Sequence, residues 1–193
     1  AALDVAALYR YLAFLWCPGT ATPLAGVSRL APGEALVVHD GRVVSRERWS
    51  APTFAGARVR LRPKEAARAV ADTLRAAVER QLVADVPVGA LLSGGLDSSA
   101  IVAFARERVP ELDCFTCAPE GGPDAGEGND LPYARLVARH FGLRLHEVPI
   151  RSGELANELE RMVYRLDEPI ADPAPLALWL MSGLARRQGV KVL

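Results

Sequence analysis

The most constraining feature of this chain is residues 86–103, where an apolar run breaks at two glycines and resumes as an alanine-rich segment. The run Val86–Leu92 has the length of one buried strand, and Ala100–Ala105 has the composition of a helix. A strand, a tight turn and a helix start form an anion site in many α/β proteins, because the first N–H groups of a helix have no intrahelical partner. The stretch therefore predicts a phosphate site at the end of a strand.

The residues of the turn, Ser93–Ser99, fit that use. Gly94 and Gly95 allow backbone conformations and close approaches that a side chain would prevent. Asp97 is the exception, because a carboxylate beside a polyphosphate is repelled unless a cation lies between them. We therefore expect Mg²⁺ to bridge Asp97 and the phosphate oxygens. Hydroxyl donors come from three positions: Ser93, Ser98 and Ser99.

Ser93–Ser99 resembles the pyrophosphate loop of ATP pyrophosphatases, which split ATP between its α and β phosphates. No lysine follows the glycines, so the G-x-x-x-x-G-K-[ST] pattern of γ-phosphate-cleaving enzymes is absent. The plainer alternative is an ordinary strand-to-helix turn with a serine cap. A hydroxyl-rich sequence directly behind an apolar strand favours the ATP site.

The pattern from residue 86 onward predicts an α/β fold with a parallel sheet covered by helices on both faces, because expected strands and helices alternate. Ligands of such sheets bind at the carboxyl ends of the strands, where Ser93–Ser99 lies. The expected strands are 86–92, 112–118, 144–149 and one that starts at 190, and the expected helices are 98–108, 131–141, 153–166 and 175–187.

The first part of the chain predicts a different arrangement. Asp40-Gly41 is a strong signal for a β-hairpin turn, and residues 50–62 have the composition of a linker. We therefore expect two domains, 1–55 and 56–193, the second of which carries the site. The expected elements before the sheet are a helix over 3–16, strands at 33–39 and 43–49, and a long helix from Pro63 to about residue 84.

Composition and charge exclude several classes of protein. The formal net charge is zero, with 23 basic and 23 acidic residues, so nothing favours nucleic acid or an anionic membrane as a partner. Three cysteines provide no disulfide framework, which favours a cytoplasmic location. Cys114 and Cys117 are three residues apart on an expected strand, so their sulfurs point to opposite faces and no zinc site is expected. The expected partners are small-molecule substrates, with a homodimer left open.

A second group of candidate residues lies at Asp167–Pro173, where three carboxylates stand in a proline-punctuated stretch between two expected helices. Glu168 and Asp172 are the candidates for chemistry there, because functional groups are often exposed in such connections. A turn and capping cluster explains the stretch equally well, since Asp before Pro commonly starts a turn. Residues 119–130 are also acidic and glycine-rich, and they predict a solvated loop.

Several segments together resemble the glutamine-dependent asparagine synthetase family over nearly the whole chain. The resemblance implies a remnant of a glutaminase domain followed by a synthetase domain of the adenine nucleotide alpha hydrolase-like fold. It also implies a reaction: the side-chain carboxylate of aspartate attacks the α-phosphorus of ATP and releases pyrophosphate, and ammonia from glutamine then displaces AMP. The matching segments are Tyr11–Thr20, Gly26–Gly33, Asp85–Ser99, Pro132–Ala138 and Asp167–Pro173.

The resemblance also implies roles for single residues. The backbones of Leu92 and Cys117 would contact the adenosine part of ATP, and Asp97 would bind Mg²⁺. Asp97 and Ser98 are the first catalytic candidates, followed by Glu168 and Asp172. The residues that would hold ATP and pyrophosphate are Leu92, Ser93, Gly94, Gly95, Asp97, Ser98, Ser99 and Cys117.

The two ends of the chain predict a fragment. The chain opens without Met, and Val190–Leu193 is typical of the first half of a buried strand. In the family that the chain resembles, an N-terminal glutaminase cysteine precedes these segments and a second Gly/Asp/Glu-rich nucleotide motif follows them. We therefore expect that this exact chain neither hydrolyses glutamine nor completes amide synthesis.

Three alternatives stay open on the sequence alone. β-Lactam synthetases and the cyclases of ribosomal peptide pathways resemble the same family and adenylate a carboxylate, but an internal amine attacks it. A tRNA-modifying ATP pyrophosphatase would use Cys114 or Cys117 as a sulfur carrier. The zero net charge of the chain disfavours tRNA as a partner, and the two cysteines are expected on opposite faces of a strand. A degenerate module would bind a nucleotide without chemistry.

Overall fold

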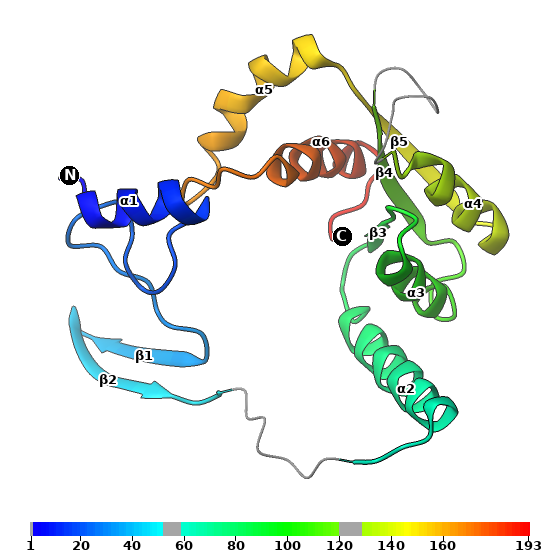
Figure 1. Ribbon diagram of the computed structural model, residues 1–193, viewed down its shortest axis with the longest axis horizontal. Helices are drawn as coiled ribbons and strands as arrows, with labels where there is room; N and C mark the ends of the chain where they lie inside the picture. The colour runs from blue at the N-terminus through cyan, green and yellow to red at the C-terminus, as the bar shows by residue number, and fades with distance from the viewer. Residues whose placement is uncertain (1, 52–58, 120–128) are drawn as a thin grey trace. The chain divides into compact units, whose positions relative to one another are not determined.

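A computed structural model describes residues 2–51, 59–119 and 129–193, which form two compact units (Figure 1). The first unit comprises Ala1–Arg60 together with Val163–Asp172, and the second comprises Leu61–Met162 and Pro173–Leu193. The boundary expected between residues 55 and 56 lies outside the described residues. Nothing in the sequence pattern indicated that a segment after α5 (Ser152–Val163) belongs to the first unit.

The first unit is built on a helix and a hairpin, as expected. The helix starts at Asp4, whose carboxylate accepts a hydrogen bond from the Ala7 N–H at 2.9 Å. The hairpin turn has positive φ at both Asp40 (48°) and Gly41 (71°), which is the geometry that an Asp-Gly turn favours. The elements are α1 (Val5–Phe14), β1 (Glu34–His39) and β2 (Arg42–Arg48), and the two strands pair antiparallel.

The second unit contains a parallel sheet with the strand order β3-β4-β5 (Figure 1). On the other side of β3, Val88 pairs with Val192 in a parallel bridge, and the Gly89 N–H donates to the Val192 carbonyl at 2.8 Å. The strand expected from residue 190 therefore lies beside β3, and the chain changes its winding direction there. The named strands are β3 (Gly89–Leu91), β4 (Asp113–Pro119) and β5 (Arg144–Ile150).

Helices cover both faces of this sheet, which confirms the expected fold class. On one face Cys114 of β4 is fully buried among residues from three helices, including Val102 and Ala134. On the other face the next residue, Phe115, packs against Ala185 of the last helix, because successive strand residues point to opposite faces. The helices of this unit are α2 (Pro63–Gln81), α3 (Leu96–Ala105), α4 (Leu131–Phe141), α5 and α6 (Ala174–Arg187).

Several element boundaries differ by a few residues from those expected, and two of them lie beside the glycines. The strand expected over 86–92 is paired as a named strand only at Gly89–Leu91, and α3 begins at Leu96 instead of residue 98. Asp97 and Ser98 therefore stand in the first turn of a helix, where N–H groups are free of intrahelical bonds. Within the described residues, no helix is long and apolar enough to cross a membrane.

Candidate functional site

The Ser93–Ser99 turn lies where the sheet changes its winding direction. It follows β3, which has β4 on one side and the Val192 segment on the other. Ligands of open parallel sheets bind outside the carboxyl ends of the strands at such a point. Leu91 pairs with Phe115, so Cys117, two residues further along β4, is at the same edge. The topology therefore brings together two segments that the sequence assigned to the nucleotide.

Gly94 is required by both its conformation and its neighbour. Its φ is +81°, and a Cβ there would lie 2.3 Å from the Ala134 nitrogen and 2.5 Å from the Tyr133 carbonyl carbon. Gly95 differs, since a Cβ on it would meet only the Ser93 hydroxyl, at 3.4 Å. The Ser93–Ser99 turn thus packs directly against the start of α4. Sequence reasoning missed this contact, and the pair of glycines was the one signal of a close approach.

Two of the three hydroxyls converge in the turn. The Ser93 and Ser98 hydroxyl oxygens are 2.9 Å apart, and the Ser98 hydroxyl donates to the Gly95 carbonyl at 3.3 Å. The Gly95 N–H donates to the Ser93 hydroxyl at 3.4 Å. The N-cap of α3 is Gly95, and no side chain caps this helix start. The first N–H groups of α3 and the paired hydroxyls therefore offer donors to one anion.

Ser99 is placed differently from the other two serines. Its hydroxyl oxygen is buried and has no hydrogen-bond partner among residues 2–51, 59–119 and 129–193. The residue borders an apolar hollow together with Leu136 and Phe141 of α4. Ser99 thus differs from Ser93 and Ser98, whose hydroxyls contact each other, and a ligand contact for its side chain stays a prediction.

Asp97 is an exposed carboxylate in the first turn of α3, and it forms no ion pair with any residue that the structure describes. The described part of the chain contains no cluster of three or more His, Cys, Asp or Glu that could hold a metal by itself. Mg²⁺ characteristically binds through one or two carboxylates, waters and substrate phosphates, without a full protein cage. One free carboxylate beside an anion site therefore fits a magnesium ion that arrives with a phosphate ligand.

The two cysteines of β4 point to opposite faces of the sheet, as expected. Cys114 is fully buried, and burial raises the pKa of its thiol to about 12. The Cys117 sulfur lies 4.0 Å from the Ala177 carbonyl of α6, and burial raises the pKa of this thiol as well. Both thiols are therefore protonated near neutral pH, and a protonated thiol is a poor nucleophile or metal ligand. This disfavours the sulfur-carrier alternative.

The second acidic stretch belongs to the first unit, whereas the Ser93–Ser99 turn belongs to the second. Glu168 forms an ion pair with Arg29 at 3.0 Å. The same guanidinium donates to the carbonyls of Cys17 and Ala21. The Ala171 N–H donates to the Leu15 carbonyl at 2.9 Å, and Asp172 also has an interaction partner. These contacts hold 163–172 on the segment around Cys17, a pairing that no sequence spacing indicated.

Comparison with known proteins gives consistent matches. The asparagine synthase family model matches residues 69–193. The glutamine-hydrolysing asparagine synthetase 1 of Bacillus subtilis is 29% identical over 185 residues, which cover 96% of this chain and 28% of that protein. A putative glutamine-hydrolysing asparagine synthetase of Mycobacterium tuberculosis is 34% identical over 194 residues, covering 98% of this chain and 29% of that protein. The chain thus spans less than a third of the length of these relatives.

Solved structures give a weaker likeness. An NMN synthetase from Francisella tularensis aligns with a TM-score of 0.43 at 15% identity, covering 69% of this chain and 54% of that chain. A glutamine-dependent NAD⁺ synthetase from Acinetobacter baumannii, in complex with ADP, aligns with a TM-score of 0.42 at 18% identity. The second alignment covers 79% of this chain and 32% of that chain.

Proposed function

The chain belongs to the asparagine synthase family, as its motifs predicted, and from this premise we propose that it carries the ATP site of a glutamine-dependent asparagine synthetase. In the proposed reaction ATP activates the side-chain carboxylate of aspartate, and ammonia derived from glutamine then forms the amide. The substrates are small molecules, the proposed location is the cytoplasm, and a homodimer is compatible with the proposal.

One observation carries the proposal: the Ser93–Ser99 turn at the winding change of the sheet. Its backbone is held against α4 at Gly94, its hydroxyls meet at Ser93 and Ser98, and its helix start is uncapped. An uncapped helix start with added hydroxyl donors suits a polyphosphate, because the helix dipole and the free N–H groups both favour negative charge. The backbones of Leu92 and Cys117, at the same sheet edge, are the proposed contacts for adenosine.

The proposed chemistry needs help at the leaving group. A carboxylate oxygen attacks the α-phosphorus, the bond from that phosphorus to the oxygen shared with the β-phosphate breaks, and pyrophosphate leaves with the electron pair. The hydroxyls of Ser93 and Ser98 and the first N–H groups of α3 would stabilise the charge that develops on pyrophosphate. Asp97 would hold Mg²⁺, which when bound supplies positive charge against the same oxygens.

The amide-forming half follows from the same intermediate. The ammonia nitrogen attacks the acyl carbon of the adenylate, the carbon–oxygen bond to AMP breaks, and a proton leaves the nitrogen. Asp97 and Ser98 are the first candidates for catalytic roles, with Glu168 and Asp172 after them. Glu168 ranks behind Asp97 because its carboxylate already has a cationic partner in Arg29.

The test is pyrophosphate release from ATP and Mg²⁺ by the protein expressed from its whole open reading frame. We expect release that depends on aspartate, and a loss of about 100-fold in its rate for Asp97→Asn, the size typical of removing one transition-state charge contact. Glu111→Gln is the matched control, because it removes one exposed carboxylate at the amino end of β4, away from the turn.

Other outcomes would favour other functions. No release with any carboxylate would contradict the enzyme and favour a nucleotide-binding module. A β-lactam synthetase or peptide cyclase relative would be favoured if aspartate had no effect, if a substrate that carries its own amine supported pyrophosphate release, and if the product were cyclic. Release only with tRNA would favour a modifying enzyme.

A further inference from the structure

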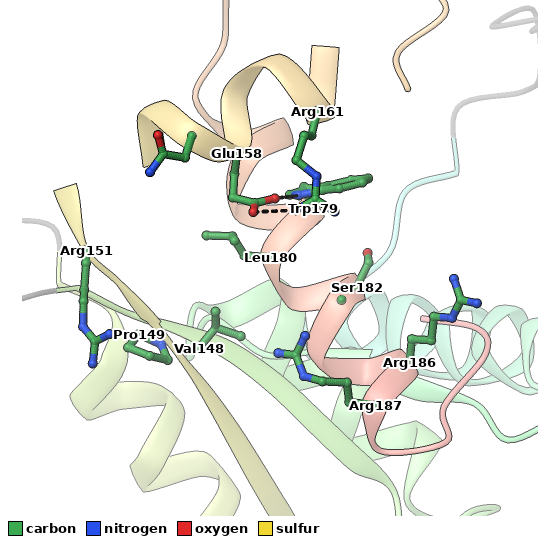
Figure 2. Close-up of a pocket in the computed structure, with 12 residues that line it drawn as sticks. Val148, Pro149, Arg151, Glu158, Arg161, Trp179, Leu180, Ser182, Arg186 and Arg187 are labelled. Atoms are coloured by element: carbon green, nitrogen blue, oxygen red, sulfur yellow. Dashed lines mark hydrogen bonds and ion pairs between the residues drawn. The ribbon is translucent and has the colours of Figure 1, made fainter. Parts of the chain in front are cut away.

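A cavity of about 630 Å³ lies between β5, α5 and α6 (Figure 2). Its lining residues come from the end of β5 (Val148, Pro149), from α5 (Glu158, Arg161) and from α6 (Trp179, Arg187). None of its lining residues belongs to the Ser93–Ser99 turn, and Cys117 does not line it. The cavity is therefore separate from the proposed ATP site.

The charge around this cavity is unbalanced. Among the described residues, four arginines line it, Arg151, Arg161, Arg186 and Arg187, against the one carboxylate of Glu158, and Arg151 has an interaction partner of its own. That carboxylate is already engaged, because the Trp179 indole N–H donates to it at 2.8 Å and Arg161 pairs with it at 2.8 Å. The same two contacts hold the pKa of Glu158 below its ordinary value. Among the described lining residues, the positive charges of Arg186 and Arg187 are thus left without a carboxylate partner.

Arg187 is the cation best placed to use that excess. Figure 2 shows its guanidinium directed toward Val148, whereas Arg186 extends away from it on the other side of α6. Arg187 forms no ion pair with any residue in the described part of the chain. Its Nη1 would lie 3.6 Å from a Cβ on Gly183, one turn earlier, so the glycine leaves the guanidinium room over the helix.

The rest of the lining favours an organic ligand over a bare ion. Trp179, Leu180, Val148 and Pro149 form an apolar wall beside the cations. A volume of about 630 Å³ falls within the range of small-molecule sites, roughly 300–1,000 Å³, and exceeds what an inorganic anion fills. The planar arginine fork matches the two oxygens of a carboxylate or phosphate.

We propose that this cavity binds a small organic anion, in which a carboxylate or a phosphate is attached to a flat apolar group. Arg187 binds the oxyanion, and the apolar group packs along Trp179 and Leu180. The site is additional to the proposed ATP site and does not depend on it. A ligand there would contact both α5 and α6.

Trp179 provides a direct reporter for the test. The chain has three tryptophans, and replacing Trp16 and Trp49, both in the first unit, by Phe leaves Trp179 alone. Phenyl phosphate and benzoate are titrated into this full chain while Trp179 fluorescence is recorded. We expect a saturable change in fluorescence with at least one of the two probes. The probe that binds more tightly identifies the preferred anion as a phosphate or a carboxylate.

Two variants test the assigned contact. Arg187→Gln should weaken binding at least tenfold, whereas Arg139→Gln, which removes an exposed arginine of α4, should leave it unchanged. Gly183→Glu should abolish binding, because its carboxylate would occupy Arg187. This variant keeps the test valid if Arg187→Gln does not fold, since the position has room for a side chain and Glu favours a helix more than Gly does.

Three results would overturn the proposal. The first is no saturable change with either probe. The second is equal binding by the parent and by both the Arg187→Gln and the Gly183→Glu chains. The third is inorganic phosphate binding as tightly as phenyl phosphate, which would show that the apolar wall contributes nothing.

Discussion

Two acidic residues that look alike in the sequence, Asp97 and Glu168, have different surroundings in the structure. Asp97 stands exposed at the start of α3 and forms no ion pair with a described residue. Glu168 is mostly buried and its carboxylate lies 3.0 Å from the Arg29 guanidinium. A carboxylate without a cationic partner can accept a metal ion, whereas one already paired mainly holds structure together. The two candidates therefore differ in whether the carboxylate already has a cationic partner, and not in residue type.

The largest expected effect concerns the glycines beside Asp97. Gly94→Ala should lower the free energy of unfolding by about 3 kcal/mol, because the new Cβ would combine a left-handed backbone with overlap against α4. Gly95→Ala is the matched control and should cost less than about 1 kcal/mol, since its Cβ would meet only the Ser93 hydroxyl oxygen, at the ordinary contact distance of 3.4 Å. Urea denaturation of both variants measures the difference. Equal midpoints for the two variants would contradict the close packing of Gly94 against the start of α4.

The next effect concerns the partner of Glu168. Glu168→Ala should weaken the attachment of 163–172 by about 1.4 kcal/mol, because it leaves a half-buried guanidinium short of one partner. The Ala171 N–H, which bonds to the Leu15 carbonyl, should then exchange with solvent about tenfold faster. Glu47→Ala on β2 removes an exposed carboxylate and should leave that exchange unchanged.

Replacing Asp97 should change stability little and activity strongly, in contrast to the effect expected for Glu168. Asp97→Asn is expected to change the free energy of unfolding by about 0.5 kcal/mol or less, the size of an exposed charge at a helix start. Its effect on pyrophosphate release should nevertheless be large. A loss of stability comparable to that of Glu168→Ala would erase the contrast between the two carboxylates.

The smallest effects concern paired carboxylates in the two units. The Arg46 side chain holds the pKa of Glu34 at about 2 in the hairpin, and Arg135 holds the pKa of Glu147 below its ordinary 4.5 in the sheet. A lowered folded pKa means that each pair stabilises above about pH 4.5, and that this contribution is lost as the pH falls through the folded value.

NMR titration of the two glutamates measures these values. Arg46→Gln should return the Glu34 pKa toward 4.5 and leave Glu147 unchanged, and Arg135→Gln should do the reverse. A shift of both carboxyls in either variant would contradict the separate pairings.

Much of the fold follows from local pattern. Asp40-Gly41 specifies its hairpin turn because both positions take positive φ without strain. Cys114 and Cys117 were assigned to opposite faces by the two-residue period of a strand, and their burial agrees. The extent of β3 was less predictable, since where pairing begins and ends depends on the neighbouring strand, and β3 pairs with β4 from Gly89 to Leu91.

The kind of site could be inferred from local sequence, because a strand, two glycines, hydroxyls and one carboxylate at a helix start all lie within a few residues of each other. What each of these residues faces depends on the packing of distant segments. Gly94 meets Tyr133 and Ala134, and Glu168 meets Arg29, across long separations in the chain. The physical reason is that periodicity and turn chemistry act over a few residues, whereas close approach, burial and charge pairing depend on which distant segments pack together.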